Sequence, residues 1–167
     1  MKLISIELPE TIRKIGNHAF FHCDTLKSLG NNFYKITSIG THAFSGEAGS
    51  RPSTEMALEF EELPSGLEEL GVNAFYNCKK IKATKIPEKI KNINGFTFAF
   101  CTSLTISDFK NVSYVGDYAF YNIQDTVTKN LSVTNLTSIA GPRSFEKAYL
   151  ALESIEYRSS NISKNTL

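Results

Sequence analysis

The sequence lacks the long apolar runs and the one-sided charge that mark two large classes of protein. No stretch approaches the roughly 18 to 20 consecutive apolar residues that span a bilayer, and the residues after Met1 lack the apolar core of a signal peptide. The 18 basic side chains are balanced by 17 acidic ones, whereas proteins that bind polyanions carry a basic excess. We therefore expect neither membrane insertion nor a nucleic-acid partner.

Motifs of catalysis and cofactor binding are also missing. There is no G-x-S-x-G, no Gly-Lys-Ser phosphate loop, no H-E-x-x-H and no glycine-rich dinucleotide turn. Neighbouring carboxylates occur at Glu61-Glu62 and Glu68-Glu69, where a solvated surface is the favoured interpretation. We expect no enzyme and no cofactor, and an enzyme remains a distant alternative.

The chain does contain an internal repeat with the template I-x-x-I-G-x-x-A-F-x-x-C-x-x-L. The segment from Ile12 to Leu26 recurs from Leu67 to Ile81. Further copies, some of them degenerate, begin at Ile36, Ile90, Val112 and Leu136. Six units of about 23 residues follow, centred on Phe20, Phe44, Phe75, Phe98, Phe120 and Phe145.

A second pattern, L-x-x-I-x-L-P, lies between the alanine-phenylalanine pairs. It runs from Leu3 to Pro9 and from Ile81 to Pro87, and it begins again at Leu152. Alternation of apolar and polar residues over this length is typical of a short strand with one buried face. Proline then ends the strand, because it donates no hydrogen bond to a neighbouring strand.

Stacking of the units is predicted because one 23-residue unit cannot bury its own apolar residues. Each template position then forms a column, and Gly16, Gly40, Gly71 and Gly116 are expected where the backbone needs a positive φ or a close approach. Asn94 is expected to take the left-handed conformation in this column. The predicted domain spans residues 1–158, followed by a polar tail at 159–167.

These recurring residues closely resemble the BspA-type leucine-rich repeats. The resemblance covers about Leu3 to Tyr157 and implies a right-handed solenoid of about six units, with short parallel strands on one face and turns or short helical segments on the other. It also implies a surface or secreted protein that adheres to host matrix, host cells or other microbial surface proteins. An intracellular scaffold, located in the cytoplasm, is the alternative.

Cysteine and histidine are the candidates for metal binding, and for both the structural explanation is favoured. Cys23, Cys78 and Cys101 each follow the template phenylalanine by three residues, so we expect a packed column rather than a disulfide or metal site. His18 and His42 share one template position and should stack about 5 Å apart. A zinc site there would lack a clear fourth ligand, and no metal is expected.

The binding surface is predicted on the outward residues of the L-x-x-I-x-L segments. They are Glu7, Glu59, Lys82, Lys85, Asp108, Ser132, Glu153 and Glu156. In a solenoid such residues form one broad surface, where a protein partner would bind. Strand edges at the two ends also predict possible end-to-end self-association.

Overall fold

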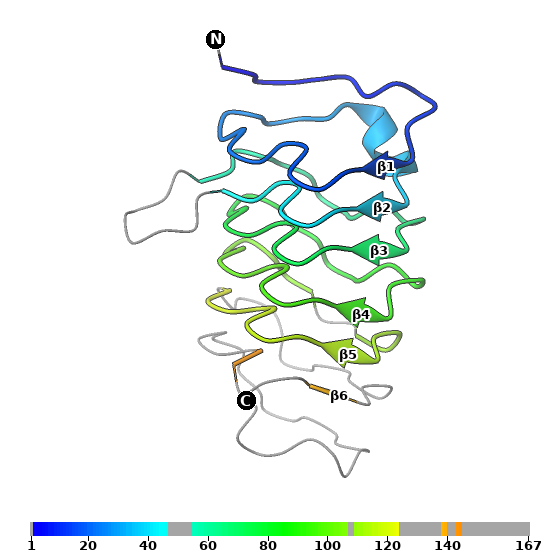
Figure 1. The fold of residues 1–167 in the computed structure, drawn as a ribbon, viewed down its shortest axis with the longest axis vertical. Helices are drawn as coiled ribbons and strands as arrows, with labels where there is room; N and C mark the ends of the chain where they lie inside the picture. The colour runs from blue at the N-terminus through cyan, green and yellow to red at the C-terminus, as the bar shows by residue number, and fades with distance from the viewer. Residues whose placement is uncertain (1, 47–54, 107–108, 124–137, 140–142, 145–167) are drawn as a thin grey trace.

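The computed structural model describes residues 2–46, 55–106, 109–123, 138–139 and 143–144. Its elements are β1 (Lys14–Ile15), η1 (Asn31–Lys35), β2 (Ser38–Ile39), β3 (Glu69–Leu70), β4 (Asn92–Ile93), β5 (Tyr114–Val115) and β6 (Ser138–Ile139). Figure 1 shows the strands one above another along the long axis of the molecule. No helix in these described residues is long and apolar enough to cross a membrane.

Neighbouring strands pair in parallel and in the register of the repeat. Ile15 lies opposite Ile39, and Ile39 lies opposite Leu70. Ile93 is paired with Val115 in the same way. The strand orders β1-β2-β3 and β4-β5-β6 place consecutive units side by side. The repeat fold with short parallel strands, predicted from the spacing, is confirmed.

The strands lie in a different part of the unit from the one expected. Each strand consists of the two residues that precede the glycine position of the template. The expected strand around Ser5 makes only an isolated parallel bridge to Ser28. The proline that ends each L-x-x-I-x-L-P segment also starts a turn, because its carbonyl accepts an N–H three residues later. These bonds run to Pro9 from Ile12, to Pro64 from Leu67 and to Pro87 from Ile90. The regular strand pairing therefore begins only after this turn.

In the described residues the core is built around a column of stacked phenylalanine rings, one from each of the first five units. The ring centroids are separated by 5.3 Å for Phe20–Phe44, 5.5 Å for Phe44–Phe75, 5.7 Å for Phe75–Phe98 and 5.5 Å for Phe98–Phe120. All of these rings are fully buried except that of Phe20, which is partly buried. Full burial of such a side chain stabilises a fold by about 1.5–3 kcal/mol. Phe145 lies outside the described residues.

The glycine column is explained by close approach of the backbones. A Cβ on Gly40 would lie 2.7 Å from the carbonyl carbon of Gly16. A Cβ on Gly71 would lie only 2.4 Å from the carbonyl carbon of Gly40. None of these glycines has a positive φ, which among the described glycines is found at Gly30. Of the two explanations open from the sequence, the close approach therefore holds for Gly40, Gly71 and Gly116, whereas a Cβ on Gly16 would meet nothing within 4 Å.

Asn94 takes the place of glycine in this column, and the left-handed conformation expected for it is wrong. It is not among the residues with a positive φ. Its side-chain Nδ2 instead donates to the carbonyl oxygen of Leu70 at 2.5 Å. A side chain cannot fit where backbones touch, so β3 and β4 are not paired and belong to different sheets.

The left-handed conformation occurs at two other positions of the unit, both occupied by residues with side chains. The first position lies two residues before the core phenylalanine. Its φ is between 53° and 56° at His18, His42, Asn73, Phe96 and Tyr118. The second lies two residues after that phenylalanine, at His22, Asn77, Phe100 and Asn122. Such φ values are uncommon outside glycine. Their recurrence shows that hydrogen bonding between units, as from His18 N to Thr41 O at 2.9 Å, fixes the turn whatever the side chain.

Candidate functional site

The surface of the L-x-x-I-x-L segments carries ion pairs between successive units. A glutamate-rich unit is followed by a lysine-rich one, and most of these glutamates and lysines form ion pairs with each other. The pairs are Glu55–Lys79 at 2.5 Å, Glu59–Lys80 at 3.1 Å, Glu61–Lys82 at 3.2 Å, and Glu68–Lys89. Exposed pairs of this kind contribute little to stability, but they neutralise the charge of the surface.

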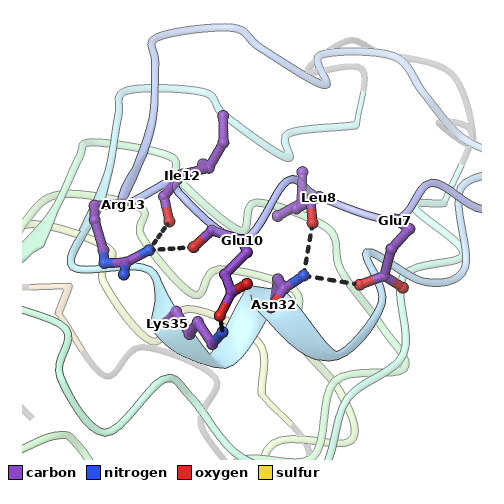
Figure 2. A network of polar contacts seen from close by, with 7 residues as sticks. All are labelled: Glu7, Leu8, Glu10, Ile12, Arg13, Asn32 and Lys35. Atoms are coloured by element: carbon purple, nitrogen blue, oxygen red, sulfur yellow. Dashed lines mark hydrogen bonds and ion pairs between the residues drawn. The ribbon is translucent and has the colours of Figure 1, made fainter.

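The structure places four of the predicted partner-binding residues on exposed positions. Glu59 and Lys82 are engaged in the ion pairs just described. Glu7 accepts a hydrogen bond from Nδ2 of Asn32 at 3.3 Å (Figure 2). Lys85 has no acidic partner within ion-pair distance among the described residues, so it differs from the other three. The remaining predicted residues lie outside the described part of the chain: Asp108, Ser132, Glu153 and Glu156.

A polar network ties the first unit to η1. Nζ of Lys35 lies 2.9 Å from Oε1 of Glu10, and the hydrogen bond and charge of Lys35 hold the pKa of Glu10 below its ordinary value. Nη1 of Arg13 donates to the carbonyl oxygens of Glu10 and Ile12 at 2.6 and 2.8 Å (Figure 2). These contacts give hydrogen-bond partners to the backbone carbonyl groups of the turn that leads into β1.

Lys85 lines a groove of about 610 Å³ beside the proline turns. Apolar side chains of Tyr34, Leu63, Ile86 and Pro87 form part of its lining. The charged side chains in the lining are Glu62, Lys85, Glu88, Lys89 and Lys110. This size lies within the range of about 300–1,000 Å³ that is typical of ligand sites, as is the mixture of apolar wall and charged groups.

Two of the charged groups in the groove are already engaged. Glu62 accepts a hydrogen bond from Oγ1 of Thr84 at 2.8 Å, and Lys89 is paired with Glu68 outside the groove. Lys85 is an exposed cation of the lining for which the described residues supply no counter-charge. The sequence identified Lys85 but not the groove, because the groove depends on how the proline turns of separate units come together.

A second surface carries aromatic side chains at the left-handed positions. The rings of Phe96 and Tyr118 are stacked at 4.7 Å. Nη1 of Arg143 donates to the hydroxyl oxygen of Tyr118 at 2.7 Å, and its guanidinium lies 5.6 Å from that ring. Phe96 and Tyr118 occupy the template position of His18 and His42, whose stacking was predicted from the sequence, but the left-handed backbone that aligns these side chains was not.

His18 and His42 stack as expected, with ring centroids 5.0 Å apart. Nδ1 of His42 is buried without a hydrogen-bond partner, and Nε2 lies 3.4 Å from Nδ2 of Asn73. Burial, and then the nearby His18, lower the pKa of His42. In the described part of the chain, no group of three or more His, Cys, Asp or Glu residues is arranged to hold a metal ion.

The cysteines lie in the core beside the phenylalanine column as free thiols. Sγ of Cys78 donates to the carbonyl oxygen of Phe44 at 3.2 Å, and Sγ of Cys101 donates to that of Phe75 at 3.1 Å. Burial raises the pKa of both thiols. Cys23 is only partly buried, because it lies in the first unit.

Comparison with known proteins identifies a family. The model of the family described as BspA type leucine-rich repeat region matches residues 1–55 and 53–166, in six copies. A solved structure described as a leucine-rich repeat protein from Bacteroides ovatus is similar at 20% sequence identity and a TM-score of 0.42. The match covers 81% of this chain and 48% of that one, so the chain spans about half the length of that protein. No curated protein matches the chain.

Proposed function

Because the chain belongs to the BspA-type leucine-rich repeat family, we propose that it is a protein-interaction module of a cell-surface or secreted adhesion protein. Its six units form one right-handed solenoid over residues 1–158, and residues 159–167 are a polar tail. A solenoid offers a long, rigid surface on which a partner can contact several units at once. Its role is to hold another protein.

The groove at Lys85 is the proposed site of contact. The observation that carries this proposal is the unpaired charge: Lys79, Lys80, Lys82 and Lys89 each meet a glutamate of the preceding unit, and Lys85 does not. A cation at the mouth of a partly apolar groove attracts a carboxylate that brings an apolar group with it.

The partner chemistry follows from this lining. An extended peptide segment fits, with an aspartate or glutamate facing Lys85 and an apolar residue against Ile86 and Pro87. Glu7, Glu59, Lys82, Asp108, Ser132, Glu153 and Glu156 belong to the wider surface that the partner covers. Charged residues at the rim steer association more than they hold the complex.

Selection from a displayed library of random peptides tests the site. We expect peptides retained by the wild-type chain to be enriched in Asp and Glu next to apolar residues, and their binding to weaken at least tenfold in Lys85→Glu. The matched control is Lys27→Glu, an exposed lysine outside the groove and outside this wider surface, which should retain binding. Equal loss in both variants, or no acidic preference, would count against the groove.

The location is tested separately. Antibody against the chain should label intact cells of the source organism, and external protease should remove the label. Label that appears only after the cells are opened would favour the intracellular scaffold and leave the groove experiment unaffected.

A further inference from the structure

The residues Asn94 and Gly95 lie at the joint between the two sheets of the stack. They are the single Asn-Gly pair among the 167 residues. Nδ2 of Asn94 donates to the carbonyl oxygen of Leu70 at 2.5 Å. The sheet of β1-β2-β3 ends on one side of this hydrogen bond, and the sheet of β4-β5-β6 begins on the other. A side-chain amide therefore links the two sheets at this point.

The backbone nitrogen of Gly95 is not engaged, unlike its counterpart in the second unit. The N–H of Gly95 has no acceptor within the described part of the chain. At the equivalent position of the second unit, the N–H of Thr41 donates to Oδ1 of Asn17 at 2.8 Å. The nitrogen of Gly95 is thus available to react with the side chain that precedes it.

Two further features favour a reaction between these neighbours. Both Asn94 and Gly95 are only partly buried, so water reaches them. Gly95 has no Cβ, which leaves the path to the asparagine side chain open and lets the backbone rotate more freely. Every other asparagine of the sequence precedes a residue with a side chain. The pair is therefore distinguished from the rest of the chain by both sequence and structure.

We propose that Asn94 is a site of spontaneous deamidation, which modifies the stack at the joint of its two sheets. The nitrogen of Gly95 attacks Cγ of Asn94, and a new C–N bond forms as the bond from Cγ to Nδ2 breaks. The amide nitrogen takes the proton of the Gly95 N–H and leaves as ammonia. Water then opens the cyclic imide at either of its two carbonyl carbons, which yields aspartate or isoaspartate. No atom is oxidised or reduced, and water is the only other reactant.

Both products remove the link between the sheets. In the aspartate product, a carboxylate that only accepts hydrogen bonds faces the carbonyl oxygen of Leu70, which also only accepts. In the isoaspartate product the main chain runs through the former side chain. The carbonyl group of Asn94, which accepts from Oγ1 of Thr97 at 2.7 Å, then leaves the main chain as a carboxylate.

The modification limits the lifetime of the folded chain. Each unit of a solenoid is held mainly by contacts with its neighbours, so the loss of one link weakens the stack between its third and fourth units. Conversion accumulates with time and needs no enzyme. Older molecules therefore open more readily at this joint than newly made ones.

Incubation of the native 167-residue chain at mildly alkaline pH, followed by peptide mapping with mass spectrometry, tests the site. Asn94 should convert at least tenfold faster than Asn92, an exposed asparagine of β4 that precedes Ile93. The rate should rise with pH, because the attacking nitrogen must lose its proton. An isoaspartyl methyltransferase should label the peptide that contains Asn94. Gly95→Ala should slow the conversion at least tenfold.

Thermal unfolding of the same samples tests the consequence. The incubated wild-type chain should melt at a lower temperature than the fresh chain, and Asn94→Asp should show a lowered melting temperature without incubation. The comparison of Asn94 with Asn92 within one wild-type chain remains valid if Gly95→Ala folds poorly, since its new Cβ would lie 3.2 Å from Asp117 O.

Three results would overturn the proposal. The first is an Asn94 amide that stays intact in the native chain under conditions that convert it in urea. The second is conversion of Asn92 as fast as that of Asn94. The third is a converted chain that melts at the same temperature as the fresh one.

Discussion

The side-chain amide of Asn94 donates to the carbonyl oxygen of Leu70 at 2.5 Å, in the place where neighbouring units use a glycine backbone N–H. Gly71 N donates to Ile39 O at 2.8 Å, and Gly116 N donates to Ile93 O at 2.7 Å. The asparagine thus holds two units together at the point where its own side chain keeps their backbones from pairing. The boundary between the two sheets is a consequence of this one substitution in the template.

Replacement of Asn94 by alanine should lower the free energy of unfolding by about 1–3 kcal/mol, because the Leu70 carbonyl loses its donor while the steric bulk at Cβ remains. Urea unfolding followed by circular dichroism measures the change. Asn92→Ala in β4 is the matched control, since Asn92 is exposed, and it should change stability by less than about 0.5 kcal/mol. Equal effects of the two substitutions would contradict the role given to the amide.

Replacement of Gly71 by alanine should destabilise the chain by at least about 1–3 kcal/mol, the usual cost of overpacking. The new methyl group would lie 2.3 Å from Thr41 N and 2.4 Å from the carbonyl carbon of Gly40, and neither backbone atom can move without disturbing the ladder. Thermal unfolding measures the loss, with Gly66→Ala as the control. A Gly71 variant as stable as that control would show that the units can separate freely.

Much of the architecture could be predicted from the sequence because stacked units repeat their contacts. The positions of Phe20, Phe44 and Phe75 predicted the column of rings, and the shared position of His18 and His42 predicted their stacking. The family model, which finds six copies, confirms the number of units. These predictions require only that residues at the same template position of successive units stack on one another, and the repeat spacing shows which residues share a position.

The details that failed depend on the backbone path within one unit. The segment ending at Pro87 has the alternation of a strand, but the turn that Pro87 starts moves the regular pairing to Asn92–Ile93. The left-handed conformation was assigned to Asn94, the residue type that tolerates it, although hydrogen bonds between units impose it on Phe96 and Tyr118. The groove at Lys85 could not be predicted from the sequence for a similar reason, because residues from separate turns form it.

The thiols should differ in reactivity towards iodoacetamide in the native chain. Cys78 and Cys101 are fully buried, and burial raises the pKa of both, so the reactive thiolate is scarce at neutral pH. Cys23 is partly exposed and should be modified first. Mass spectrometry of peptides after labelling, with and without urea, resolves the three sites. Rapid native labelling of Cys101 would mean that the stack opens between its third and fourth units.

Stability should fall as the solution is acidified through the range in which histidine titrates. The pKa of His42 is lowered from its ordinary value of 6.5 by burial and by His18, so the unfolded chain binds a proton more readily than the folded one. The free energy of unfolding should therefore be highest above pH 6.5, decrease as the pH falls from there to the lowered pKa, and become level below it. Urea unfolding at a series of pH values from about 7.5 to 5.5 measures the decrease.

His42→Asn should flatten this dependence, and the repeat itself supplies the replacement, because Asn73 occupies the same left-handed position in the next unit. The matched control is His22→Asn, since Asn77 and Asn122 fill its position elsewhere. Both variants keep a residue that tolerates positive φ, so a difference between them reports protonation rather than backbone strain. A pH dependence that survives in His42→Asn but disappears in His22→Asn would assign the effect to His22 and contradict the stacked pair of His18 and His42 as its source.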